Sequence, residues 1–149
     1  MKVLITGACG FIGFHTCKKL IQNDFEVLGI DNFNSYYDTS LKESRLIELN
    51  NILTKGRFNI LREDIKNLEF LKKTFYEFKP DIVVNLAAQA GVRYSIENPS
   101  EYIQTNLLGF GNILECCRML NVKNFVYASS SSVYGGNTKM PFSEIQSVD

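Results

Sequence analysis

The chain has 149 residues, enough for one domain with its own hydrophobic core. Lys plus Arg number 16 and Asp plus Glu also number 16, and this balance argues against nucleic acid or an anionic membrane as the main partner. No apolar run has the length of a membrane span, and Met1 leads directly into a strand-like run without a signal peptide. We therefore expect a cytoplasmic protein that does not bind a membrane.

Short apolar runs alternate with longer amphipathic ones along the whole chain. In chain order they predict a strand over Lys2–Thr6, a helix over Phe11–Asn23, a strand over Glu26–Ile30, a polar loop over Asn32–Thr39, a helix over Ser40–Asn50, a strand over Arg57–Leu61, a helix over Leu68–Phe78, a strand over Ile82–Asn85, a helix over Pro99–Leu120, a strand over Phe125–Ala128 and a loop over Ser129–Asp149. This alternation indicates an α/β fold, a doubly wound parallel sheet of the Rossmann type with strand order 3-2-1-4-5. Such sheets bind ligands beyond the carboxyl ends of their strands.

The loop after the first strand contains regularly spaced glycines. Gly7, Gly10 and Gly13 have the spacing G-x-x-G-x-x-G between a strand and an amphipathic helix, which is the context that gives the motif meaning. Gly7 allows a tight turn, Gly10 lets a pyrophosphate approach the backbone, and Gly13 lets the helix pack closely. The free amides of the helix start, with Phe11 and Ile12, would face the phosphates. The motif favours dinucleotide binding over a merely structural turn.

A carboxylate stands at the end of the second strand. Asp31, followed by Asn32, lies 18 positions after Gly13, where an acidic side chain accepts hydrogen bonds from the adenosine ribose hydroxyls. A carboxylate there would repel a 2′-phosphate, so the predicted cofactor is NAD rather than NADP. The alternative is a solvated aspartate that caps the next turn.

Other reactive side chains form no recognisable centre. His15, the only histidine, lies in the first helix, too early to face the serine cluster at 129–132 as in a serine hydrolase. Adjacent Cys116 and Cys117 lack a metal-ligand spacing, and we expect no metal site. Cys9 lies in the glycine loop, where a helix N-terminus can lower a thiol pKa, although a small residue that fits a tight loop is the favoured interpretation.

The glycine spacing after a threonine resembles the extended branch of the short-chain dehydrogenase/reductase superfamily. Beyond these glycines, three stretches are similar to the UDP-glucuronate 4-epimerase group: Asp31–Asp38, Gln89–Pro99 and Ser143–Glu144. The resemblance runs over essentially the whole chain. It implies an NAD-dependent enzyme that epimerises C4 of a nucleotide sugar, by oxidation to a 4-keto sugar and reduction from the other face.

The resemblance also implies roles for particular residues. Asp64 and Ile65 would line the adenine pocket, the backbone of Leu86, Ala87, Ala88 and Gln89 would run beside the cofactor, and Asn106 would brace the site. Counted back from Val133-Tyr134-Gly135, the catalytic serine falls on Ser130, with a slip of one place onto Ser129 or Ser131 as the alternative. Ser129 and Ser131 would otherwise contact the sugar. Arg93 would pair with a uronate carboxylate, hold the pyrophosphate or brace its loop.

The catalytic base of this group is a tyrosine with a lysine four residues later. None of the seven tyrosines here is followed by a lysine at that position. We therefore expect residues 1–149 to form a truncated NAD-binding domain, with the sheet incomplete at its C-terminus and the substrate domain absent. A nucleotide-sugar 4,6-dehydratase or decarboxylase, or a non-catalytic NAD-binding fragment, are the alternatives. In the complete enzyme, Pro99–Leu120 would contribute to a homodimer interface.

Overall fold

The computed structural model describes residues 1–52 and 57–148; the last residue of the predicted final loop, Asp149, lies outside them. The strands are β1 (Lys2–Thr6), β2 (Glu26–Asp31), β3 (Arg57–Arg62), β4 (Ile82–Asn85) and β5 (Asn124–Tyr127). The helices are α1 (Phe11–Gln22), α2 (Thr39–Asn50), α3 (Leu68–Phe78), α4 (Val92–Glu97), α5 (Pro99–Tyr102) and α6 (Phe110–Met119), with a π-helix, η1 (Ile103–Gly109), and a 3-10 helix, η2 (Ser131–Tyr134).

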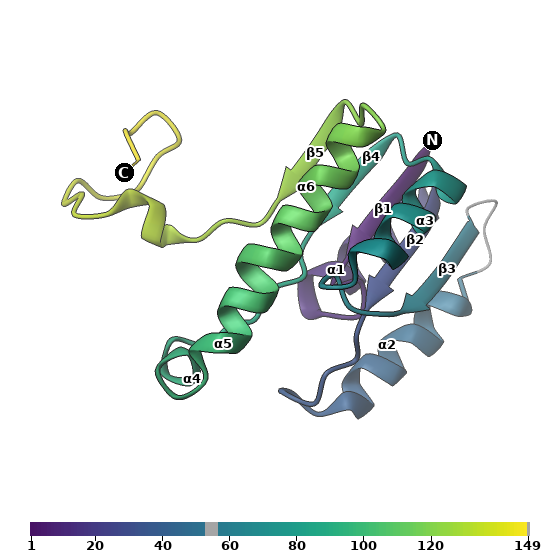
Figure 1. Ribbon diagram of the computed structural model, residues 1–149, viewed down its shortest axis with the longest axis horizontal. Helices are drawn as coiled ribbons and strands as arrows, with labels where there is room; N and C mark the ends of the chain where they lie inside the picture. The colour runs from purple at the N-terminus through teal and green to yellow at the C-terminus, as the bar shows by residue number, and fades with distance from the viewer. Residues whose placement is uncertain (53–56, 149) are drawn as a thin grey trace.

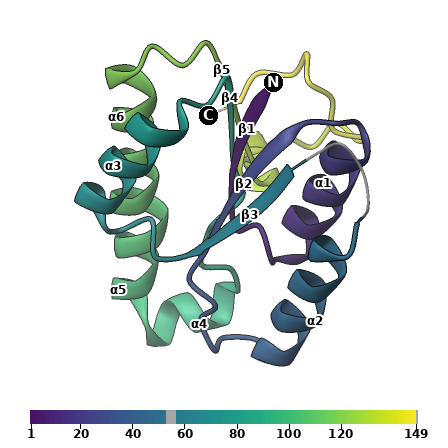
Figure 2. The ribbon, with the colours of Figure 1, turned by 90° about the vertical axis from the view of Figure 1, so that its right-hand side faces the viewer.

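The five strands form one parallel sheet in the order β3-β2-β1-β4-β5, so the predicted fold class and strand order are confirmed. Figure 2 shows this sheet nearly edge-on, with α1 and α2 covering one face and α3, α5 and α6 the other. Both faces are covered because each crossover between parallel strands places a helix against the sheet.

The core consists of two layers, one on each face of the sheet. In β1, Leu4 packs in the layer under α3 and α6, whereas Val3 and Ile5 pack in the layer under α1 and α2. This alternation follows from the two-residue period of a strand. Phe75 of α3 and Ile21 of α1 are fully buried in their respective layers. The apolar runs that predict the strands therefore face helices on both sides.

The predicted long helix over Pro99–Leu120 is a run of three segments. The segments α5, η1 and α6 follow one another without a break, and η1 has π-helical hydrogen bonding. A further short helix, α4, lies where the sequence predicted a loop, and η2 lies within the predicted C-terminal loop. Helices of four to six residues carry little periodicity and depend on tertiary contacts, which explains why the pattern missed them.

The chain leaves the sheet after β5. Figure 1 shows the C-terminal segment, in yellow, extending away from the rest of the molecule. β5 pairs with β4 and forms one edge of the sheet, and its Val126 and Tyr127 are exposed. Across residues 1–52 and 57–148, no helix combines the length and the apolar character needed to cross a membrane.

Candidate functional site

A cavity of about 450 Å³ opens beyond the carboxyl ends of β1 to β4. Its walls come from the glycine loop, the end of β2 and the loop after it, α2, and the segments that follow β3 and β4. Eleven predicted cofactor residues line it, namely Gly7, Gly10, Phe11, Asp31, Asn32, Asp64, Ile65, Leu86, Ala87, Ala88 and Gln89. Segments distant in sequence meet here because parallel strands end at the same edge of the sheet.

The glycine loop is shaped by close backbone contacts. Gly7 has φ +67°, and a Cβ there would lie 2.9 Å from the amide nitrogen of Ala87. A Cβ on Gly13 would overlap the carbonyl oxygen of Gly7, so Gly13 packs α1 against the loop although it does not line the cavity. Gly10 is the N-cap of α1 and provides no side-chain cap, which leaves amides of the first helical turn without side-chain partners. These amides and the helix dipole suit an anion.

A buried hydroxyl joins the glycine loop to the segment after β4. The Oγ1 of Thr6 donates a hydrogen bond of 2.6 Å to Oδ1 of Asn85 and accepts from the amides of Leu86 (3.2 Å) and Ala87 (3.1 Å). Thr6 is completely buried. The floor of the cavity is therefore fixed between β1 and β4 by a fully satisfied polar cluster.

The carboxylate of Asp31 is only 4% exposed and faces the same cavity. Its Oδ2 accepts the amide of Cys9 at 3.0 Å, and its Oδ1 accepts the amide of Phe33 at 2.9 Å and the ammonium of Lys42 at 2.8 Å. Asp31 is the last residue of β2 rather than the first after it. Two carboxylate oxygens offer about four acceptor positions, so lone-pair capacity remains for a further donor.

Asn106 fixes the position of the segment after β4. Its Oδ1 accepts the amide of Gln89 at 2.8 Å, and its Nδ2 donates to the carbonyl of Gln89 at 3.0 Å. It lies in the π-helix η1 and outside the cavity wall, although Thr105 beside it lines the cavity. Gln89 lies beyond the end of β4, so no neighbouring strand pairs with it in the sheet. The side chain of Asn106 provides the hydrogen bonds for both its backbone amide and its carbonyl instead.

Asp64 and Ile65 form the wall after β3. Asn32 donates to Oδ2 of Asp64 at 2.9 Å, and Lys66 lies 3.4 Å from the same oxygen. Ile65 is 3% exposed and packs in the core. This wall therefore presents a polar edge beside an apolar surface.

The sequence analysis missed an aromatic and a cationic part of the cavity. Tyr36 and Tyr37 line it from the loop after β2, and Lys42 and Arg45 line it from α2. Both tyrosines lie within Asp31–Asp38, one of the stretches that resemble the epimerase group, but the sequence analysis predicted no role for them. Lys42 and Arg45 are three residues apart and therefore lie on the same face of α2. The sequence does not show that this face points into the cavity, so their spacing alone did not predict a role.

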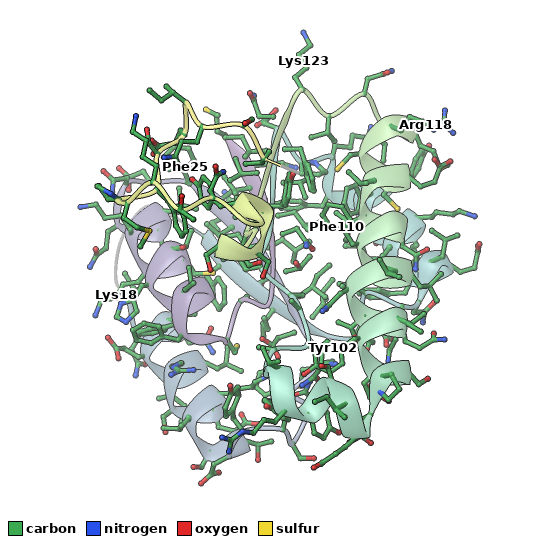
Figure 3. All side chains as sticks on the ribbon, turned by 90° about the vertical axis from the view of Figure 1, so that its left-hand side faces the viewer. Lys18, Phe25, Tyr102, Phe110, Arg118 and Lys123 are labelled. Atoms are coloured by element: carbon green, nitrogen blue, oxygen red, sulfur yellow. The ribbon has the colours of Figure 1, made fainter. Side chains whose placement is uncertain are left out.

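Tyr36 also lines a second cavity of about 350 Å³, which shares Asn34, Tyr36 and Gln89 with the first. Tyr94 of α4 packs against Tyr36 and Tyr102, with ring centroids 4.9 and 6.3 Å away. The hydroxyl of Tyr102 donates to the carbonyls of Ala90 and Gly91. Figure 3 shows Tyr102 near α4, at the end of the helical run opposite Arg118. These contacts hold α4 against the loop after β2.

The predicted substrate residues lie outside the first cavity. Ser129, Ser130 and Ser131 are exposed beyond β5, and the hydroxyl oxygen of Ser130 caps η2 by accepting the amide of Ser132 at 3.3 Å. Arg93 is exposed on α4 and lines neither cavity. Ile12 does not line a cavity either. The structure thus brings eleven of the fourteen predicted cofactor residues into one cavity wall, but none of the predicted sugar contacts.

Cys9 is completely buried beside Asp31. Burial and then the nearby carboxylate raise the pKa of its thiol to about 12, which outweighs any lowering by the helix N-terminus. The environment therefore agrees with a small packed residue rather than a reactive thiolate. Among the described residues, no group of three or more His, Cys, Asp or Glu side chains is arranged to hold a metal ion.

The fold and the glycine loop define a Rossmann-like domain of the short-chain dehydrogenase/reductase type. The family model for GDP-mannose 4,6 dehydratase matches residues 4–149, and the chain belongs to this family. It is 53% identical over 149 residues to Protein CapI of Staphylococcus aureus and 49% identical over 150 residues to UDP-glucuronate 4-epimerase 2 of Arabidopsis thaliana. The match covers all of this chain but 43% and 34% of those relatives, respectively.

Solved structures agree with this assignment. The UDP-glucose 4-epimerase of Stenotrophomonas maltophila, solved with NAD and formylated UDP-arabinopyranose, matches with a TM-score of 0.81 and 29% identity over all of this chain and 43% of that one. The Thermus thermophilus UDP-glucose 4-epimerase complex with NAD matches with a TM-score of 0.76 and 34% identity, over 97% and 43% of the two chains. The resemblance to the N-terminal part of a nucleotide-sugar epimerase or dehydratase is confirmed.

Proposed function

We propose that residues 1–149 are the NAD-binding domain of an NAD-dependent nucleotide-sugar 4-epimerase that interconverts UDP-glucuronate and UDP-galacturonate. The observation that carries the cofactor part is the buried carboxylate of Asp31, which faces the same cavity as the open glycine loop. The sugar part rests on similarity to relatives named UDP-glucuronate 4-epimerase.

The residues present fit NAD. The amides at the start of α1 suit a pyrophosphate, and a Cβ at Gly7 or Gly13 would close the loop that presents them. Asp31 retains acceptor capacity for a ribose hydroxyl, and Ile65 offers an apolar surface to an adenine ring. Bound NAD would supply the hydride acceptor and donor for the reaction at C4.

The chain would position the cofactor, and the residues after 149 in an intact relative would hold most of the sugar. Ser130 would donate a hydrogen bond to the reacting oxygen, because a serine hydroxyl cannot act as a base unaided. That role requires the segment after β5 to turn back toward the cavity, away from the arrangement in which Ser130 caps η2. Arg93 would meet a carboxylate or phosphate only if α4 borders the completed site.

The test is a chimera of residues 1–149 with the remaining residues of the Staphylococcus aureus relative, compared with the 149-residue chain alone. We expect the chimera to convert UDP-glucuronate to UDP-galacturonate, followed by NMR of the sugar protons. The short chain should be inactive because it has no Tyr-x-x-x-Lys pair. Ser130→Ala should lower kcat of the chimera by roughly 10²-fold, more than Ser129→Ala or Ser131→Ala does, and Ser147→Ala in the exposed C-terminal segment is the control.

Other outcomes have distinct meanings. Turnover of UDP-glucose but not of UDP-glucuronate would contradict the uronate assignment. A 4-keto-6-deoxy product would identify a 4,6-dehydratase, the activity named by the family model. Binding of NAD without any turnover by the chimera would favour the non-catalytic alternative.

A further inference from the structure

Three consecutive residues, Gln89, Ala90 and Gly91, join the cofactor cavity to α4, the short helix that carries Arg93. Gln89 and Ala90 line the cavity, and Gly91 is the N-cap of α4. Gly91 has φ +101°, and a Cβ there would overlap the hydroxyl oxygen of Tyr36. The direction in which α4 leaves the cavity wall therefore depends on a backbone conformation that favours glycine.

Two side chains from one helical run hold all three of these residues. Asn106 forms hydrogen bonds with both backbone groups of Gln89, at 2.8 and 3.0 Å. Tyr102 donates to the carbonyl of Ala90 at 2.7 Å and to that of Gly91. Tyr102 and Asn106 are four residues apart, so they lie on the same side of the run. The run from α5 to η1 thus fixes the backbone from the cavity wall to the start of α4.

The Tyr102 hydroxyl makes its contact where α4 begins. The carbonyl of Gly91 also accepts the amide of Ser95 at 3.2 Å, which closes the first turn of α4. A helix of six residues is not stable alone, and α4 has no buried residue. Tyr94 adds ring contacts with Tyr36 and Tyr102. Loss of the Tyr102 hydroxyl should therefore loosen α4 without disturbing the core.

Arg93 is the second residue of α4, two places after Gly91. Its guanidinium is exposed, and within residues 1–52 and 57–148 no carboxylate lies close enough to form an ion pair with it. A guanidinium without a counter-charge can bind an oxyanion through two parallel hydrogen bonds. Where that group lies depends on the start of α4, and so on the contact between Gly91 and Tyr102.

We propose that Tyr102 is a positioning residue for the sugar nucleotide, which holds Arg93 in place for an oxyanion of that ligand through Gly91 and the first turn of α4. This inference rests on the proposed function and places α4 at the border of the sugar site. A uronate carboxylate and a diphosphate both offer paired oxygens to a guanidinium. Tyr102 acts through the backbone, so its hydroxyl should matter to the affinity for the sugar nucleotide and not to that for NAD.

The first test measures amide hydrogen exchange in the 149-residue chain by NMR. Tyr102→Phe keeps the ring that packs against Tyr94 and removes only the hydroxyl. We expect the amide of Ser95 to exchange about two- to tenfold faster than in the natural chain, which corresponds to the loss of one neutral hydrogen bond. Tyr76→Phe, at an exposed tyrosine of α3, is the matched control and should leave this rate unchanged. Circular dichroism confirms that both variants are folded.

The second test measures binding to the NAD-loaded chimera by isothermal titration calorimetry. Tyr102→Phe should weaken binding of UDP-glucuronate about two- to tenfold and leave the Kd of NAD for the chimera unchanged. Arg93→Gln should weaken binding of UDP-glucuronate about tenfold or more, because a charge-assisted hydrogen bond is lost. In the Arg93→Gln background, Tyr102→Phe should have no further effect. A merely structural role of Tyr102 would not depend on Arg93 in this way.

Three ligands distinguish the two sources of the oxyanion. Titrations of Tyr102→Phe and Arg93→Gln are repeated with UDP-glucose, which has no carboxylate, and with UDP, which has no sugar. A loss confined to UDP-glucuronate assigns Arg93 to the uronate carboxylate, whereas an equal loss for all three assigns it to the diphosphate. Either result supports the positioning role of Tyr102.

Several results would overturn the inference. They are unchanged exchange at Ser95, unchanged binding of all three ligands by Tyr102→Phe, equal weakening of NAD and UDP-glucuronate, additive effects of Tyr102→Phe and Arg93→Gln, and a Tyr102→Phe variant that does not fold. A chimera that binds UDP-glucuronate without converting it would contradict the proposed function but not the role of Tyr102. A chimera that binds no sugar nucleotide would overturn both.

Discussion

At the scale of single residues, the cavity is built from polar groups that already have partners. Asp31 accepts two amides and an ammonium, Thr6 donates to Asn85, and Asn106 holds both polar groups of the Gln89 backbone. Among the described residues, no buried side-chain nitrogen or oxygen lacks a hydrogen bond. A satisfied network of this kind keeps the wall in place before any ligand arrives.

The four cysteines give a prediction about reactivity and pH. All are buried, and burial is the first cause that raises the pKa of Cys9 and Cys17 to about 12 and of Cys116 and Cys117 to about 11, from an ordinary 9.0. We expect Ellman's reagent at about pH 8 to label none of them in the folded chain and all four in guanidinium chloride. Rapid labelling of Cys9 in the folded chain would restore the reactive interpretation.

The same raised pKa values predict a loss of stability at alkaline pH. Because the unfolded thiols ionise near pH 9.0 and the folded ones higher, protons are held more tightly in the folded state above that pH. The contribution of the thiols to the free energy of unfolding is therefore complete below about pH 9 and is lost as the pH rises toward about 12. Urea titrations across this range should show the decline, and Cys17→Ala should make it shallower.

At the scale of elements, the helical run from α5 to α6 carries the largest departure from the sequence pattern. The π-helix η1 contains Asn106, which holds Gln89, and Thr105, which lines the cavity. π-helical turns often lie at functional sites, since the extra residue per turn directs side chains away from their regular helical positions. The amphipathic pattern predicted the run itself but contained no signal for the widened turn.

Two glycines of this run give a matched pair of substitutions. A Cβ on Gly109 in η1 would lie 2.6 Å from Cγ1 of the buried Ile65, whereas a Cβ on Gly111 in α6 would meet nothing within 4 Å. Gly109→Ala should lower the free energy of unfolding by about 1–3 kcal/mol through overpacking. Gly111→Ala should raise it by roughly 0.5–1 kcal/mol, because alanine restricts the unfolded chain. Urea denaturation measures both, and equal effects would contradict this account of Gly109.

At the scale of the whole molecule, the run from α5 to α6 also exposes apolar side chains. Ile103, Leu107 and Leu114 are 54%, 69% and 42% exposed, and their spacing places them along one side of the run. Apolar stripes of this kind on a helix frequently mark an interface between subunits. This is where the sequence analysis expected the homodimer interface.

We therefore expect the chain to associate with itself through this side of the run. Leu107→Glu should shift the sedimentation equilibrium toward monomer by placing a charge in the interface. Ile145→Glu, on the exposed C-terminal segment, is the control and should leave the equilibrium unchanged. A natural chain that remains monomeric at high micromolar concentration would contradict the prediction.

The sequence by itself determined the class of fold, the strand order and most of the cavity wall. Its alternating runs specify buried parallel strands, and parallel strands bring their following residues to one edge of the sheet, so Gly7, Asp31, Asp64 and Leu86 meet there without further information. These are consequences of local pattern and topology. They do not depend on how any particular helix is rotated.

Only the tertiary structure decided which side chains from outside those strand ends complete the site. The rotation of α2 carries Lys42 to Asp31 and Arg45 to the carbonyl of Cys9, and the widened turn of η1 carries Asn106 to Gln89. Burial in the packed loop, rather than the helix N-terminus, sets the pKa of Cys9. Such contacts depend on distances between elements far apart in the chain, and periodicity within a single element contains no information about them.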